Sequence, residues 1–225
     1  MEAIKGSLAL DAMGGDMGPL EVVEGLKIAL NNGAGKLTQD PILVVGREDE
    51  LIPALRSVGL QDDPRVRVIH AEEVIGMDEK PMNALKKKKG SSMLVALDLV
   101  KAGDAKAILS CGNTGSLMGG GTIKLRPLDG IERPALATII PSLKQPFVLL
   151  DAGANPESTP THLMQNAILG SNFARAVLAI PKPRVGLLTI GTEEGKGGER
   201  IQETHRLLKE IGDVLELSES RVCQI

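Results

Sequence analysis

Short aliphatic runs alternate with longer amphipathic stretches along this chain of 225 residues, and this alternation limits the folds open to it. Runs typical of buried parallel strands lie at residues 8–10, 42–45, 66–69, 107–109, 135–140, 147–150 and 185–190. Helices are predicted between them, at residues 19–32, 48–58, 91–101, 117–124, 159–177 and 199–211. Alternation of this kind produces parallel strands joined by right-handed crossovers. The sequence therefore predicts an α/β protein with three αβα layers and a mostly parallel sheet.

The composition excludes several kinds of partner. A net charge of −3 and the absence of Trp and Tyr argue against a nucleic-acid surface, which needs positive charge and stacking rings. The two cysteines and three histidines show no metal-ligand spacing, so no metal site is expected. No apolar run approaches the roughly 18 residues of a membrane span. A soluble, cytoplasmic protein is predicted.

Loops rich in glycine and small polar residues follow four of the predicted strands, at residues 11–16, 110–116, 151–155 and 191–198. The carboxyl ends of parallel strands share one edge of a sheet, where ligands bind. Glycine allows close approach of the backbone, and the helix that follows offers unpaired N–H groups. We expect these loops to bind a small anion, above all phosphate, although any one of them is alternatively an ordinary turn.

Several other residues have both a structural and a functional interpretation. The run Lys86–Lys89 is either a solvated helix face or a basic surface for an acidic partner, with Ser91 or Ser92 capping the next helix. Arg133 either binds an oxyanion or pairs with the adjacent Glu132. His70 and His162 are read as structural, and Cys111 as a small buried residue rather than a reactive thiol.

Six motifs occur in one order, at residues 11–16, 90–93, 112–115, 130–135, 151–155 and 190–197. With them the chain resembles the bacterial phosphate acyltransferase family, PlsX, from about residue 7 to about residue 211. The resemblance implies transfer of a fatty acyl group from acyl carrier protein to inorganic phosphate, giving acyl phosphate for phosphatidic acid synthesis. It also implies a fold like the isocitrate and isopropylmalate dehydrogenases, a homodimer, no metal or cofactor, peripheral membrane contact and a downstream glycerol-3-phosphate acyltransferase.

In that reaction phosphate is itself the nucleophile, so the protein has to position it and stabilise the developing oxyanion. The candidate catalytic residues are Asn113, Thr114 and Arg133. The candidates for binding phosphate or substrate are Asp11, Gly14, Gly15, Asp16, Ser91, Ser92, Gly112, Gly115, Ser116, Asp151, Asn155, Glu194 and Lys196.

The resemblance fades toward the end of the chain. Residues 1–211 are predicted to be one phosphate acyltransferase domain that lacks the C-terminal part of the family fold, and residues 212–225 a divergent tail. Two alternatives stay open: a phosphotransacetylase-like enzyme that uses acyl-CoA, and an inactive truncated form that keeps only binding or dimerisation surfaces.

Overall fold

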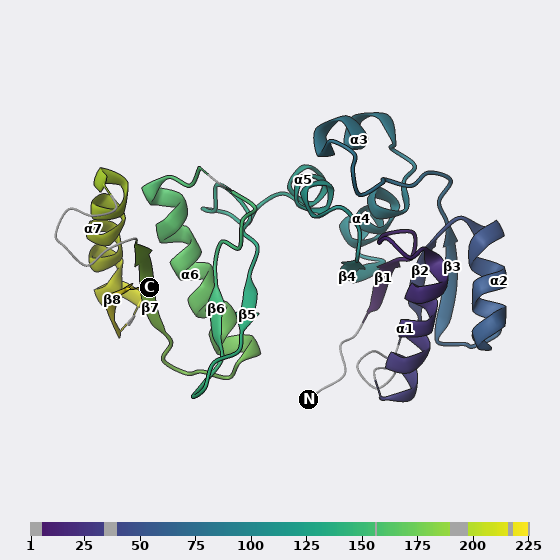
Figure 1. The fold of residues 1–225 in the computed structure, drawn as a ribbon, viewed down its shortest axis with the longest axis horizontal. Helices are drawn as coiled ribbons and strands as arrows, with labels where there is room; N and C mark the ends of the chain where they lie inside the picture. The colour runs from purple at the N-terminus through teal and green to yellow at the C-terminus, as the bar shows by residue number, and fades with distance from the viewer. Residues whose placement is uncertain (1–5, 34–39, 156, 190–197, 216–217, 225) are drawn as a thin grey trace. The chain divides into compact units, whose positions relative to one another are not determined.

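The computed structural model describes residues 6–33, 40–155, 157–189, 198–215 and 218–224. The chain divides into two compact units, Met1–Arg126 and Pro127–Ile225 (Figure 1). The predicted division at residue 211 lies within α7 (Gly198–Leu215), and the assignment of residues 1–211 to one family domain stays a prediction. None of the helices in the described ranges is long and apolar enough to cross a membrane.

The first unit is built on a parallel sheet of four strands in the order β3-β2-β1-β4. The strands are β1 (Ser7–Asp11), β2 (Ile42–Gly46), β3 (Val66–His70) and β4 (Ala105–Ser110). All three pairings are parallel, with Ala9 of β1 opposite Leu43 of β2 and Ile108 of β4. The predicted parallel strands of this half of the chain are thus confirmed.

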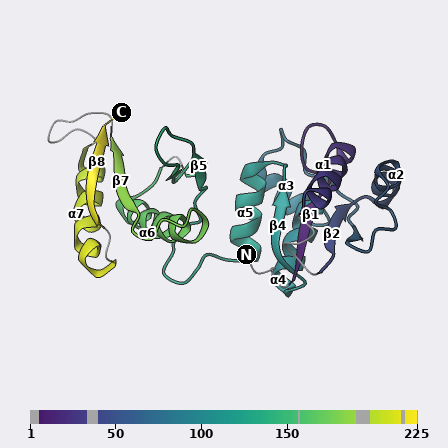
Figure 2. The same cartoon turned by 90° about the horizontal axis from the view of Figure 1, so that it is seen from below.

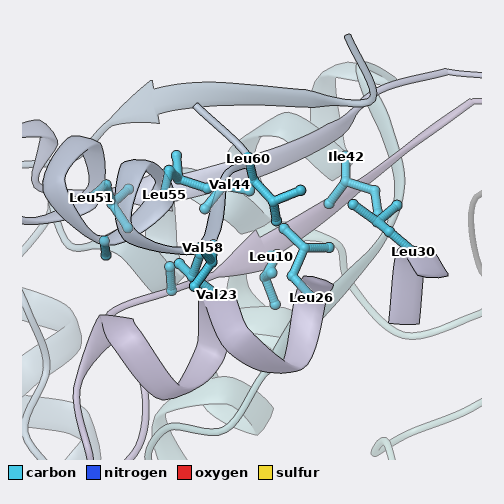
Figure 3. Packing of buried hydrophobic residues seen from close by; sticks show 12 residues of the cluster. Leu10, Val23, Leu26, Leu30, Ile42, Val44, Leu51, Leu55, Val58 and Leu60 are labelled. Carbon is cyan, nitrogen blue, oxygen red and sulfur yellow. The ribbon is translucent and has the colours of Figure 1, made fainter. Parts of the chain in front are cut away.

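Five helices accompany this sheet: α1 (Pro19–Asn31), α2 (Glu48–Val58), α3 (Pro81–Lys87), α4 (Ser92–Ala102) and α5 (Thr114–Lys124). Side chains alternate across a strand, so Leu10 and Val44 pack beneath α1 and α2, as Figure 3 shows. Ala9 and Leu43 pack on the opposite face with Ala96 of α4. Figure 2 shows α1 and α4 on opposite sides of this sheet. The unit therefore has the predicted three layers. The short helix α3 was not predicted.

The second unit contains β5 (Thr138–Ile140), β6 (Phe147–Leu149), α6 (Pro160–Val177), β7 (Arg184–Thr189), α7 and β8 (Ser218–Gln224). The prediction of parallel strands was wrong for residues 135–140 and 147–150, because β5 and β6 pair antiparallel. The connection between them, residues 141–146, is too short for the crossover that parallel strands need. β8, in the segment predicted to be a tail, pairs parallel with β7.

Candidate active site

Two of the four predicted loops meet because β1 and β4 are neighbours in the sheet. Asp11 lies opposite Ser110 in the strand register, and the Ser110 hydroxyl donates to Asp11 Oδ2 at 2.6 Å. The same hydroxyl accepts from the Gly112 N–H at 3.1 Å. A Cβ on Gly14 would lie 2.8 Å from the Gly112 nitrogen, so only glycine allows this approach. The loops at 11–16 and 110–116 therefore form one rim.

Asp11 is hydrogen-bonded within the protein at this rim and is not exposed to solvent. Its side chain is buried, and Oδ1 accepts from the Met13 N–H at 3.3 Å while Oδ2 takes the Ser110 hydroxyl. A carboxylate also repels an anion. The geometry favours a bracing role for Asp11 over direct contact with phosphate.

Asn113 is the N-cap residue of α5, and its side chain also binds a second loop. Its Oδ1 accepts from the Ser116 N–H at 2.8 Å, which caps the helix. Its Nδ2 donates to the carbonyl oxygens of Met77 at 2.8 Å and Glu79 at 3.2 Å. Both polar atoms of the side-chain amide are thus committed to backbone groups. The sequence analysis placed the start of this helix three residues too late, at 117.

The loop that Asn113 holds is closed by an ion pair. Glu79 Oε1 accepts from the Gly76 N–H at 2.7 Å and pairs with Lys88, whose Nζ also donates to the Val74 carbonyl at 2.7 Å. The pKa of Glu79 lies below its ordinary value, chiefly because Lys88 donates a hydrogen bond to the carboxylate and secondly because the Gly76 N–H does. Within the lysine run, Lys88 is therefore structural, whereas its three neighbours in the run are exposed.

The amino end of α5 presents unpaired donors to solvent. Thr114 and Gly115 are exposed, and their first-turn N–H groups have no partner in the described part of the chain. A Cβ on Gly115 would lie 2.6 Å from Cγ of Pro81, so glycine is required for α3 to pack here. Two free N–H groups at the positive end of a helix can bind a phosphate oxygen.

The three predicted serines are not at the solvent-facing surface. Ser91 and Ser116 are 0% exposed and Ser92 is 2% exposed. Ser91 is the N-cap residue of α4 but makes no side-chain cap, and Oγ of both Ser91 and Ser116 lacks a hydrogen-bond partner among the described residues. Their assignment as phosphate ligands stays a prediction that requires these hydroxyls to become accessible.

The remaining loop residues have simpler environments. Gly15 lies against Cys111, with a Cβ built on it 3.5 Å from that of the cysteine. Asp16 and Cys111 are both exposed, so the reading of Cys111 as a buried residue was wrong. Glu194 and Lys196 lie outside the described residues.

The third predicted loop belongs to the second unit, where it binds the protein's own backbone. Asp151 accepts from the N–H groups of Leu136 at 2.9 Å, Ala154 at 3.2 Å and Asn155 at 2.6 Å. The Asn155 amide donates to Asp151 and to the Pro134 carbonyl, both at 2.9 Å. Burial alone would raise the pKa of Asp151, but these hydrogen bonds outweigh it and hold that pKa below its ordinary value.

Arg133 does not pair with the adjacent Glu132, which was one of its two predicted roles. Glu132 pairs instead with Nε2 of His162 at 2.9 Å, and Nδ1 of that histidine accepts from the Thr159 N–H in a capping box. The structural reading of His162 is thereby confirmed. Arg133 is exposed, and it has no hydrogen bond or ion pair in the described ranges. Sequence reasoning missed Gln165, since a glutamine inside a helix gives no signal.

Two comparisons place the chain among known proteins. The family model described as "Fatty acid synthesis protein" matches residues 7–217. A solved structure, the EutD phosphotransacetylase from Staphylococcus aureus, is similar with a TM-score of 0.65 and 16% sequence identity. The similarity covers 97% of this chain and 68% of that one, and at this identity it supports the α/β fold. The chain belongs to the fatty acid synthesis protein family, the PlsX family, and is an acyl-transferring enzyme of lipid biosynthesis.

Proposed function

We propose that this enzyme transfers a fatty acyl group from acyl carrier protein to inorganic phosphate, and that the acyl phosphate product supplies phosphatidic acid synthesis. The observation that carries the proposal is the family match over residues 7–217. The rim formed by the β1 and β4 loops supports the phosphate part, because the amino end of α5 offers unpaired N–H groups there.

The proposed reaction requires neither a side-chain nucleophile nor a strong general acid. A phosphate oxygen attacks the thioester carbonyl carbon, a C–O bond forms, and the C–S bond then breaks to release the carrier thiolate. A thiol has a pKa of about 8.5, so its thiolate leaves without a strong general acid. The protein has to hold phosphate in line with the carbonyl and stabilise the oxyanion. The N–H groups of Thr114 and Gly115 suit the first task. No metal or cofactor is required by this chemistry.

Asn113 acts in this proposal as a positioning residue. Its side-chain amide is hydrogen-bonded to the Ser116 N–H and to the Met77 and Glu79 carbonyls of the loop at residues 76–80. It therefore acts through the α5 N–H groups that it fixes in place. Thr114 keeps the role predicted for it, through its backbone N–H. Unchanged turnover after Asn113→Ala would remove this loop from the mechanism.

A second candidate is a phosphotransacetylase-like reaction with acyl-CoA as donor. It is favoured by the shared fold with the Staphylococcus aureus enzyme. The test is phosphate-dependent thiol release by the purified chain from hexadecanoyl acyl carrier protein and, in parallel, from acetyl-CoA. Release only from the carrier supports the first proposal, and release only from acetyl-CoA supports the second. Phosphate binding without any turnover would support a chain that keeps only binding surfaces.

The remaining expectations complete the proposal. The enzyme forms a homodimer in the cytoplasm, contacts the membrane peripherally, and hands its labile product to a glycerol-3-phosphate acyltransferase. Light scattering on the purified chain tests the dimer, and co-sedimentation with phospholipid vesicles tests the membrane contact. A monomer at micromolar concentration, or a chain left in the supernatant, would remove the corresponding part.

A further inference from the structure

The segment at residues 130–136 lacks regular secondary structure, yet side chains hold it on both sides of Arg133. On the amino-terminal side, Gln165 of α6 donates from Nε2 to the Gly130 carbonyl at 2.8 Å and accepts at Oε1 from the Glu132 N–H at 2.9 Å. One buried side-chain amide therefore fixes a donor and an acceptor two residues apart, much as a neighbouring strand would.

The carboxyl-terminal side of the segment is held by the 151–155 loop. Asn155 Nδ2 donates to the Pro134 carbonyl at 2.9 Å, and Asp151 Oδ1 accepts from the Leu136 N–H at 2.9 Å. The backbone is thus held at positions 130, 132, 134 and 136, and the residue at the centre of these contacts is Arg133.

Arg133 carries a charge that the described residues of the second unit leave uncompensated. The adjacent Glu132 is turned to His162, and the guanidinium has no protein partner in the described ranges. Four side-chain hydrogen bonds thus hold the backbone on both sides of this arginine. The planar fork of guanidinium donors suits bidentate binding of a phosphate group, and the held backbone fixes the point from which the side chain extends.

We propose that α6 and the 151–155 loop position Arg133 to bind a phosphate group of the substrates, with Gln165 as the principal positioning residue. This inference rests on the proposed function. A phosphate group reaches the enzyme from two sources: inorganic phosphate, and the phosphodiester of the carrier's prosthetic arm. Both sources offer phosphate oxygens to the guanidinium, and the Michaelis constant of each substrate shows which of the two Arg133 binds.

The test uses four variants of the full chain: Arg133→Met, Gln165→Leu, the double variant, and Ala174→Gly. The last weakens the same helix at a buried position whose side chain has no polar atom with which to hold residues 130–136. The Michaelis constants for inorganic phosphate and for hexadecanoyl acyl carrier protein are measured for each. We expect Arg133→Met to raise one of them by about tenfold, as loss of a charged hydrogen bond does, and Gln165→Leu to raise the same one by about three- to tenfold.

The double variant decides whether Gln165 acts through Arg133. If it does, Gln165→Leu adds nothing to the Michaelis constant once Arg133 is gone, and Ala174→Gly changes neither constant. A rise for inorganic phosphate assigns that ion to Arg133, whereas a rise for the carrier assigns the prosthetic arm.

Two results would overturn the inference while leaving the proposed function intact. One is an Arg133→Met enzyme whose two Michaelis constants are unchanged. The other is a Gln165→Leu enzyme that loses only thermal stability and active fraction, or whose effect persists in full without Arg133. Failure of the unaltered chain to transfer acyl groups to phosphate from either donor would instead refute the proposed function, and this inference with it.

Discussion

Replacing Asn113 separates two roles that its amide combines. Asn113→Ala removes the cap on the Ser116 N–H and both hydrogen bonds to the 76–80 loop, whose lengths are 2.8, 2.8 and 3.2 Å. A cap is worth about 1 kcal/mol and each loop hydrogen bond about 0.5–1.5 kcal/mol net, so the first unit should lose about 2–4 kcal/mol. Asn113→Ser keeps a capping oxygen but is too short to reach the loop, and loss of the two loop hydrogen bonds should cost about 1–3 kcal/mol.

The chain has no Trp or Tyr, and both phenylalanines lie in the second unit, so intrinsic fluorescence does not report on the first unit. Hydrogen exchange followed by mass spectrometry resolves the two roles by peptide. The Gly76 amide should exchange faster in both variants, because the loop is released in both. The Ser116 amide should exchange faster in Asn113→Ala alone.

Equal protection of the Gly76 amide in the unaltered chain and in both variants would refute the reasoning, since the loop would then be held without Asn113. A Ser116 amide that exchanges equally fast in the two variants would show that the capping oxygen is not what protects it. Gly25→Ala, in a helix far from this loop along the chain and with open space around the new methyl group, serves as the control and should leave both amides unchanged.

Three further perturbations test other parts of the structure. Gly115→Ala forces a methyl group to 2.6 Å from Cγ of Pro81 and should lower the urea midpoint by the equivalent of about 1–3 kcal/mol. Gly121→Ala in the same helix meets open space, and this control should stabilise the first unit by up to about 1 kcal/mol. Ala179 has a φ of 52°, so Ala179→Gly should stabilise the second unit by about 0.5–1 kcal/mol, and a lower midpoint would contradict this. The lowered pKa of Asp151 means that its contribution to stability is fully present above about pH 4 and is lost as the pH falls through the lowered pKa, so Asp151→Asn should flatten the acid limb of a stability–pH curve.

Hydrophobic periodicity was sufficient to predict the parallel strands of the first unit and its helices other than α3. Ala9 and Leu10 alternate between the two faces of β1, and Leu43 and Val44 do the same in β2, which is what a sheet covered on both faces requires. The meeting of the 11–16 and 110–116 loops also follows from sequence, because adjacent parallel strands end at one edge.

The second unit shows where such reasoning stops. The run at 135–140 reads as a buried strand, but its pairing direction depends on the length of the following connection rather than on side-chain pattern. The roles of Asn113 and Gln165 were also out of reach, since each amide binds backbone groups more than thirty positions away in the chain. Burial of Ser91 and Ser116 depends on how α3 and α5 pack around α4, which no local pattern encodes.

The central claim is that the amino end of α5 binds inorganic phosphate, and amide chemical shifts test it most directly. Titration with phosphate at constant ionic strength, with chloride as the balancing anion, is predicted to move the Thr114 and Gly115 resonances along one saturable curve. If those two resonances stay still while amides elsewhere in the chain saturate, phosphate binds at another place and the account is contradicted.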